Sequence, residues 1–350
     1  MTVTIPFLKP VSTQDKVLFT RQMATMLDSG LHLTQALKIV RSQVRNAKFA
    51  SVIEQIEQGL QEGVSLSGNL AKFPQVFNRV YLNVVRSGEA SGQLDKVLNE
   101  LATQLEQEVS FTSRIRNAMI YPVFIILAMI GVAILTAVRI IPQLEQVFIE
   151  SNVEIPWTTK LVIASANFLI ERWPFIIAVI IVLLVLVRFF LGSYQGQLLT
   201  NRLALSDPTG LAQKVLMARF TRTLGMLLGA GVPIVEALRI VAEVMGNEYH
   251  KQSLLKIAQE LERGIPMSVP LARDKLFPPY IAQMVLVGEQ TGKLDQVLTA
   301  MAKHFEELTE NSLKTITTLF EPVVIVLIGI AVGFLVFSII VPIYQVTQAQ

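Results

Sequence analysis

The chain has no cysteine and few charged residues for its length. Because none of its 350 residues is cysteine, disulfide bonds and thiol chemistry contribute nothing to its fold or function. Charged residues make up 16% of the chain and hydrophobic residues 52%. Soluble domains carry about 25% charged residues. This deficit excludes an ordinary soluble protein and indicates long apolar segments.

Residue sets typical of catalysis or of metal binding are also missing. The three histidines, His32, His250 and His304, lie far apart in the sequence and fit no metal-ligand spacing. The segment 288–293 resembles a phosphate-binding loop, but three residues rather than four separate its glycines, and Leu294 replaces the required Ser or Thr. We therefore predict a protein that is not an enzyme and needs no cofactor and no nucleic-acid partner.

Three apolar runs are long enough to cross a lipid bilayer as helices, which takes about 20 residues. They lie within residues 119–141, 175–191 and 321–342, and the second qualifies if Arg188 extends toward the lipid headgroups. None of the three has an acidic or basic residue midway, as a proton or ion pathway normally requires. The N-terminal segment is short and polar and contains proline, so we expect no signal peptide.

The charge distribution predicts the orientation of these helices. Basic residues outnumber acidic ones in residues 1–118 and 192–319, whereas acidic residues dominate residues 142–174. Basic residues near membrane segments stay in the cytoplasm. The predicted organisation is an N-terminal tail (1–12), a first cytoplasmic domain (13–118), a membrane helix (119–141), an outside connector (142–174), a second membrane helix (175–191), a second cytoplasmic domain (192–320), a third membrane helix (321–342) and an outside tail (343–350).

The second cytoplasmic domain repeats the first. Residues 19–21 read Phe-Thr-Arg, and the same three residues return at 220–222, at an offset of 201. Residues 88–95 read Gly-Glu-Ala-Ser-Gly-Gln-Leu-Asp and return as Gly-Glu-Gln-Thr-Gly-Lys-Leu-Asp at 288–295, at an offset of 200. Solenoid repeats recur every 20 to 50 residues. The longer period here indicates a whole domain used twice.

Both copies have the hydrophobic period of α-helices. Leu94, Val97, Leu98 and Leu101 occupy one helical face. Gly30 and Gly231 are placed to end a helix. We predict an all-α membrane protein in which each copy is a bundle of about five or six short helices. The two Phe-Thr-Arg segments could anchor a partner, but we expect Phe19 and Phe220 to be buried, and Arg21 and Arg222 to be exposed, on the first helix of each copy.

Two acidic pairs, Glu89 with Asp95 and Glu289 with Asp295, leave three interpretations open. The flanking glycines suggest a helix end followed by a new start, where a carboxylate favours the helix dipole. A carboxylate site for a hard cation, with calcium at Glu89 and Asp95, is the second interpretation. A polar contact with a partner is the third.

In the third apolar run, Gly329 and Gly333 form a small-xxx-small pattern that permits close approach of two membrane helices. Chance glycines are common in such helices, so a packing role is one of two open interpretations.

Taken together, the duplicated motifs and the three membrane helices resemble the type II secretion system F family, over residues 15 to 345. The motif residues that carry the resemblance are Phe19, Arg21, Gly30, Gly88, Glu89, Gly92, Asp95, Phe220, Arg222, Gly231, Gly288, Glu289, Gly292 and Asp295. The resemblance implies a homo-oligomer in the bacterial inner membrane, with the N-terminus inside and the C-terminus outside. It also implies calcium on acidic residues of the first bundle, which favours Glu89 and Asp95.

The same resemblance implies a scaffold of a type IV pilus or type II secretion machine. Its implied partners are a hexameric cytoplasmic assembly ATPase, pilin or pseudopilin subunits, and other inner-membrane assembly proteins. The alternative is an oligomeric transporter or channel gated by its cytoplasmic domains. The sequence does not decide which of these machines the chain serves.

Overall fold

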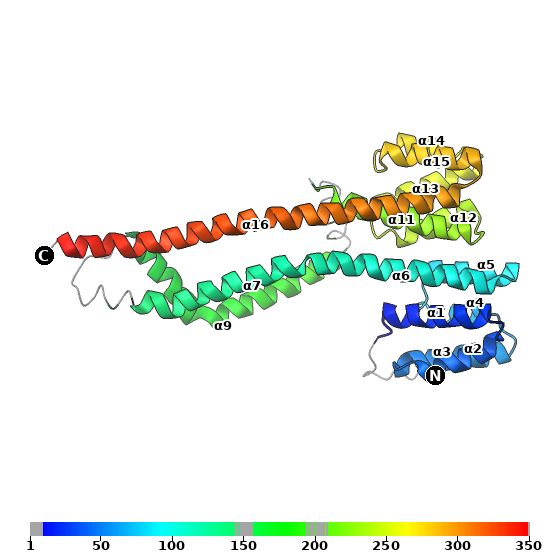
Figure 1. Cartoon of the computed structure of the whole chain (residues 1–350), viewed down its shortest axis with the longest axis horizontal. Helices are drawn as coiled ribbons and strands as arrows, with labels where there is room; N and C mark the ends of the chain where they lie inside the picture. The colour runs from blue at the N-terminus through cyan, green and yellow to red at the C-terminus, as the bar shows by residue number, and fades with distance from the viewer. Residues whose placement is uncertain are drawn as a thin grey trace. The chain divides into compact units, whose positions relative to one another are not determined.

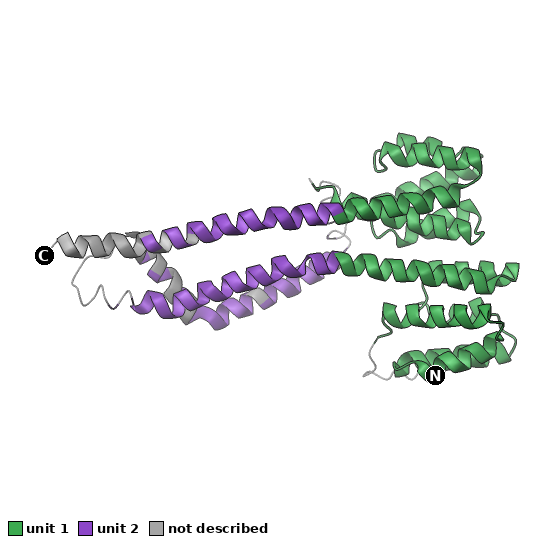
Figure 2. Ribbon diagram, in the orientation of Figure 1, with its two compact units in different colours: residues 1–114, 204–310 green, residues 115–203, 311–350 purple. Residues whose placement is uncertain are grey.

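The computed structural model describes residues 10–143, 157–193 and 209–348, together with residues 146, 196, 200 and 207. These residues form helices and no strands, which confirms the all-α prediction. They divide into two compact units: unit 1 contains residues 1–114 and 204–310, and unit 2 contains residues 115–203 and 311–350 (Figure 2).

Unit 1 holds both copies of the duplicated domain. The first copy, called here the first bundle, consists of α1 (Thr13–Asp28), α2 (Leu33–Gln43), α3 (Ala47–Gln61), α4 (Leu66–Leu70), α5 (Arg79–Ser91) and the start of α6 (Leu94–Ala118) (Figure 1). Ser12 begins α1 with a capping box, because its hydroxyl accepts from the Asp15 N–H at 3.0 Å and its own N–H donates to the Asp15 carboxylate.

Aromatic side chains form the core of the first bundle. Phe19 of α1 lies with its ring centroid 5.4 Å from that of Phe49 and 6.0 Å from that of Phe77. Tyr81 adds a fourth ring at 4.9 Å from Phe77, and its hydroxyl bonds to the buried Thr20 at 2.9 Å. Burial of four large rings stabilises a bundle whose helices are individually too short to be stable in water.

The second bundle repeats this plan with α11 (Leu211–Gly229), α12 (Ile234–Val244), α13 (Glu248–Glu262), α14 (Ser268–Arg273), α15 (Pro279–Thr291) and the start of α16 (Leu294–Gln348). Its core contains Phe220 and Phe277, with ring centroids 5.3 Å apart. Buried His250 occupies the place that Phe49 has in the first bundle and meets Phe277 edge-on at 5.6 Å. The predicted count of five or six helices per copy is therefore confirmed for the described residues.

The predicted helix ends and buried phenylalanines are confirmed too. Gly30 and Gly231 each lie two residues after the last residue of a helix, with φ of +81° and +80°. Phe19 and Phe220 are buried. Arg21 is partly exposed, but the prediction of an exposed arginine is wrong for Arg222, which is 9% exposed.

Unit 2 contains the end of α6 from Ile115, α7 (Ile120–Leu135), the π-helical turn η1 (Thr136–Ile140), α9 (Trp157–Gly192) and the remainder of α16. Among the described residues, three helices are long and apolar enough to cross a membrane, judged by length and composition: 94–143, 171–191 and 294–330. Each overlaps one of the three predicted spans. Exposed apolar side chains such as Phe124 and Phe189 cover this unit, which indicates a surface suited to lipid.

The helices of unit 2 extend beyond the predicted apolar runs. Part of the predicted connector, residues 157–174, belongs to α9, and Pro174 lies inside that helix rather than before it. The remaining connector residues lie largely outside the described part of the chain. Residues 343–348 of the predicted tail continue α16. A long helix can continue past the one backbone hydrogen bond that a proline removes.

Candidate functional site

The Phe-Thr-Arg motif fastens the first helix of each bundle to its last helix. In the first bundle, Arg21 of α1 donates from Nε and Nη2 to the two carboxylate oxygens of Glu106 on α6, both at 2.8 Å. The same guanidinium donates to the side chains of Asn99 and Thr103, also on α6. The Arg21 side chain is 32% exposed and that of Glu106 is 44% exposed. The bidentate pair raises the pKa of Arg21 and lowers that of Glu106.

The second bundle repeats this ion pair in a buried setting. Arg222 of α11 donates to Glu306 of α16, and the two side chains are only 10% and 14% exposed. Phe111 of α6 covers the guanidinium, with its ring centroid 5.3 Å from the Arg222 Cζ. Burial lowers the pKa of Arg222. The first bundle therefore contributes part of the wall around an ion pair of the second.

Sequence reasoning missed the partners Glu106 and Glu306. They lie 85 and 84 residues after their arginines, and they stand 200 residues apart, as the Gly-Glu motifs do. An alignment of the two copies along their whole length carries that signal. Only the fold shows that the last helix returns to the first.

The glutamates of the Gly-Glu motif cap a short helix in each bundle. Glu89 of α5 accepts from the backbone N–H groups of Leu66 and Ser67 at the start of α4, the second at 3.0 Å. In the second bundle, Glu289 accepts from the N–H of Met267 at 2.6 Å and from both the N–H and the hydroxyl of Ser268. A carboxylate at a helix N-terminus satisfies unpaired N–H groups and opposes the helix dipole.

The glycines of the same motif form the corner between two helices. Gly92 and Gly292 end α5 and α15 in the left-handed conformation, with φ of +66° and +67°. A Cβ on Gly88 would lie 3.0 Å from the Cβ of Val97, and one on Gly288 would lie 2.9 Å from the Cα of Leu294. The motif thus turns the chain sharply and lets consecutive helices pack closely.

The acidic pairs fit the first interpretation of their sequence, a helix end followed by a new start. Asp95 and Asp295 lie in the first turns of α6 and α16, where a negative charge favours the helix dipole. The oxygens of Glu89 already accept from backbone N–H groups. Among the described residues, no three or more His, Cys, Asp or Glu side chains group as metal ligands do. Calcium at Glu89 and Asp95 stays a prediction.

The two bundles contact each other within unit 1. Helix α5 of the first bundle packs on α11 and α12 of the second. Arg79 at the start of α5 forms an ion pair with Glu243 of α12, and the Ser87 hydroxyl donates to the carbonyl of Ala230. These contacts join α5 of the first bundle to one surface of the second. This surface, called here the α11–α12 corner, consists of the turn at residues 229–231 and of Glu243 near the end of α12.

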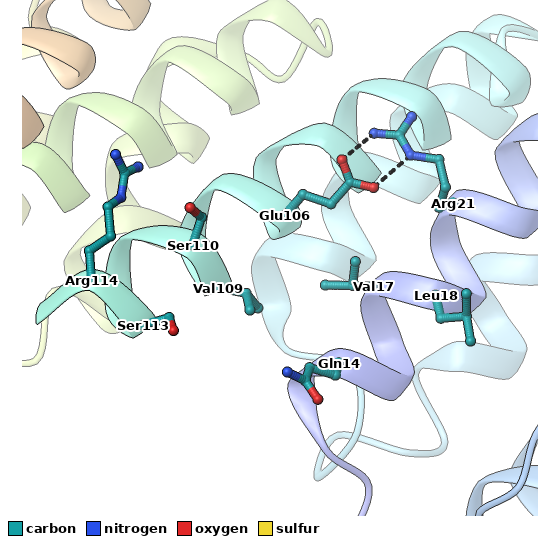
Figure 3. A pocket seen from close by; sticks show the side chains of 9 residues that line it. All are labelled: Gln14, Val17, Leu18, Arg21, Glu106, Val109, Ser110, Ser113 and Arg114. Atoms are coloured by element: carbon teal, nitrogen blue, oxygen red, sulfur yellow. Dashed lines mark hydrogen bonds and ion pairs between the residues drawn. The ribbon is translucent and has the colours of Figure 1, made fainter. Parts of the chain in front are cut away.

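A groove of about 450 Å³ lies beside the exposed ion pair of the first bundle. Figure 3 shows Val17 and Leu18 of α1 on one side and Val109 and Ser110 of α6 on the other, with the Arg21–Glu106 pair at one end. Leu18 is 53% exposed. The corresponding region of the second bundle holds the buried Arg222–Glu306 pair.

Gly329 and Gly333 lie four residues apart on α16, inside the third apolar run. A Cβ added at either glycine would meet no atom of the described residues within 4 Å. Their role in packing against another helix stays a prediction.

The comparisons with known proteins agree with the duplication. The family model for the type II secretion system (T2SS), protein F, matches twice, at residues 19–142 and 220–342. The type IV pilus assembly protein PilC of Thermus thermophilus is 35% identical over 336 residues, which is 95% of this chain and 82% of that protein. The PilC protein of Pseudomonas aeruginosa is 34% identical over 340 residues, covering 96% of this chain and 91% of the relative.

Relatives from secretion machines match over a similar length. The type II secretion system protein F of Vibrio cholerae is 30% identical over 345 residues, which is 98% of this chain and 85% of that protein. Both matched regions contain the Arg–Glu pair, the capping glutamate and the glycine corner described above. The chain belongs to the type II secretion system protein F family.

Proposed function

We propose that the chain is a non-enzymatic inner-membrane platform of a type IV pilus or type II secretion machine. In this proposal both bundles lie in the cytoplasm, and the C-terminus lies outside. Family membership supports the class of machine. The excess of basic residues in both bundles, and of acidic residues in the connector, supports the orientation.

The observation that carries the proposal is the continuity between bundle and membrane helix. Helix α16 begins as the last helix of the second bundle and continues into the third apolar run without a break. In the first bundle, α6 ends at Ala118 and α7 begins at Ile120. A helix is far stiffer than a Gly/Ser linker. A displacement of either bundle is therefore expected to reach the membrane helices.

The platform would couple a cytoplasmic motor to subunits in the membrane. A hexameric assembly ATPase would contact the bundles, and pilin or pseudopilin subunits, with other inner-membrane assembly proteins, would contact the membrane helices. The chain itself would hydrolyse no ATP.

Gene deletion with complementation tests the machine, and co-purification tests the motor. Deletion of the gene should abolish filaments or secretion, and the wild-type gene should restore them. The tagged chain should co-purify with a hexameric ATPase from detergent extracts. A deletion strain with normal pili and secretion would contradict the platform role. Ion flux through proteoliposomes that contain only this chain would instead favour the transporter.

A further inference from the structure

The contact between the two bundles uses different faces of two similar domains. The first bundle offers α5, and the second offers its α11–α12 corner. Such a contact is head-to-tail, so within the described part of the chain it leaves the complementary face of each bundle unpaired. Those faces are α15, which corresponds to α5, and the α1–α2 corner, which corresponds to the α11–α12 corner. Head-to-tail contacts can continue from one molecule to the next until a ring closes.

The free α15 carries an apolar stripe. Six large apolar side chains of unit 1 are exposed among the described residues, and Tyr280, Leu286 and Val287 of α15 account for three of them. The exposed positions of α15 recur with a helical period and include no charge: Pro279, Tyr280, Gln283, Leu286, Val287, Gln290 and Thr291. Exposed apolar patches of this kind mark interaction sites in soluble domains.

The stripe occupies the face that α5 uses inside the chain. Val287 corresponds to Ser87, whose hydroxyl bonds to Ala230 across the bundle contact. Ser87 is partly buried by that contact, whereas Val287 is 46% exposed. A second copy of the same contact would cover Val287.

The first bundle has the matching vacant face. In the second bundle, the α11–α12 corner receives α5, and Phe111 and Arg114 of α6 contact Arg222 of α11 and Glu310 of α16. The corresponding region of the first bundle is the α1–α2 corner (residues 28–30 with Ser42) and the groove of Figure 3. Arg21 takes the place of Arg222 there but stays 32% exposed.

The two residues that form an ion pair across the contact inside the chain are both replaced by uncharged residues on the free faces. Inside the chain, Arg79 of α5 pairs with Glu243 of the corner. Their counterparts are Pro279 and Ser42, so both charges are absent from the free faces. A contact between α15 and the α1–α2 corner would leave no unpaired charge at this point.

A second pair of positions exchanges its carboxylate across the contact. Inside the chain, Glu100 lies against Gly229, where an added Cβ would be 3.2 Å from the glutamate oxygen. Ala300 corresponds to Glu100, and Asp28 corresponds to Gly229. The carboxylate of the free faces therefore lies at the α1–α2 corner, and the small residue lies opposite it. The free faces again bring together one acidic and one small residue.

We propose that α15 of one copy of the chain docks on the α1–α2 corner and groove of a second copy, repeating between molecules the contact that joins the two bundles within one. The occupant of both free faces is thus the same protein. This contact adds a mode of assembly to the proposed platform role. It depends on that role only in requiring that several copies share one membrane.

The absence of cysteine makes a cross-linking test direct. Two differently tagged chains, one with Ser42→Cys and one with Pro279→Cys, are co-expressed, solubilised and treated with a short bismaleimide. Both positions are exposed. A covalent product that carries both tags is expected. The pair Arg79→Cys and Glu243→Cys within one chain is the matched control and should give an internal link.

Single-variant samples separate this contact from a two-fold one. Pro279→Cys alone should not link to itself, and linking as strong as in the mixed sample would overturn the proposal in favour of an α15–α15 dimer. No mixed product, when the internal control links, would overturn it as well. No ATPase or pilin is present, so this failure is distinct from failure of the platform role.

A charge on the stripe gives a second readout. Val287→Glu should lower the yield of the mixed product about tenfold or more, because the contact would bury an unpaired carboxylate. Gln252→Glu, on the exposed side of α13, introduces the same charge elsewhere and should leave the yield unchanged. Equal yields from both variants would contradict the proposal.

Discussion

The same arginine–glutamate pair has two different environments in the two bundles. Arg21 and Glu106 are 32% and 44% exposed beside an open groove, whereas Arg222 and Glu306 are 10% and 14% exposed beneath Phe111. Duplication preserved the residues and the two helices that they join. It did not preserve the energetics, because the first bundle covers the second and nothing among the described residues covers the first in the same way.

The largest expected effect comes from breaking each pair in turn. Arg222→Ala leaves Glu306 buried and unpaired, which should cost about 3–5 kcal/mol of stability. Arg21→Ala breaks an exposed pair and should cost about 1 kcal/mol or less. Hydrogen exchange of α11 and α1 in the detergent-solubilised chain measures the difference. Replacing both partners, Arg222→Met with Glu306→Leu, should restore most of the loss. Equal effects in the two bundles would show that burial does not distinguish the pairs.

Removal of the capping glutamates should have an intermediate effect that again differs between copies. Glu89→Ala frees two backbone N–H groups and should cost about 1–2 kcal/mol. Glu289→Ala should cost more, because the Ser268 hydroxyl loses its acceptor as well. Amide exchange at the first turns of α4 and α14 reports each loss locally. Glu289→Gln keeps one acceptor oxygen and serves as the control. Exchange in the alanine variants that matches the wild type would contradict the capping role.

The core of the second bundle should respond to pH, and that of the first should not. Burial lowers the pKa of His250, whereas Phe49 at the corresponding place has no charge to gain. The unfolded chain then binds the proton more readily, so stability is retained above pH 6.5 and lost as pH falls below it. Nearby Asp274 opposes part of the shift.

The expected loss is at most about 1.4 kcal/mol per pH unit. Exchange rates in α13 at pH 7.5 and 5.5 measure it, with α3 as the internal reference. His250→Phe copies the first bundle and should remove the pH dependence. A pH dependence that survives this change must come from other groups.

The smallest effect concerns calcium, which is predicted for the first bundle alone. If Glu89 and Asp95 bind the ion, millimolar calcium should raise the melting temperature of the solubilised chain by a degree or two, on the order of 0.5 kcal/mol. Asp95→Asn should abolish this rise, and Asp295→Asn should not. A melting temperature that is the same with and without calcium would exclude the site.

The sequence predicted the duplication, the helical bundles and the three apolar helices, because each depends on local periodicity or on direct repetition. It could not predict the partners of its own motifs. Arg21 meets Glu106 and Glu89 meets Ser67 only after the chain has turned back on itself. For the same reason, the sequence carried no sign that Glu89 accepts hydrogen bonds from backbone N–H groups, whereas calcium at Glu89 and Asp95 stays a prediction.

The differences between the copies were also hidden from sequence reasoning. His250 stood out as one of three histidines, and only its place against Phe277 shows that it replaces a core phenylalanine. The buried state of Arg222 depends on Phe111, which belongs to the other bundle. A contact between domains depends on the shapes of two folded surfaces. Hydrophobic periodicity reports local helices and gives no information about such surfaces.

The head-to-tail contact between the bundles also sets an order of events during synthesis. Glu106, which completes the first bundle, emerges before the first membrane helix, but Glu243 follows Arg79 by 164 residues. At about 5–20 residues per second, the α5 face would wait roughly ten to thirty seconds for its partner. During that time a nascent chain presents Phe111 and α5 to its surroundings, including neighbouring copies made on the same messenger. The α5 face can therefore pair with the α11–α12 corner of its own chain or with that of a neighbouring copy. Which contact forms depends on the rates of the two events as well as on their stabilities.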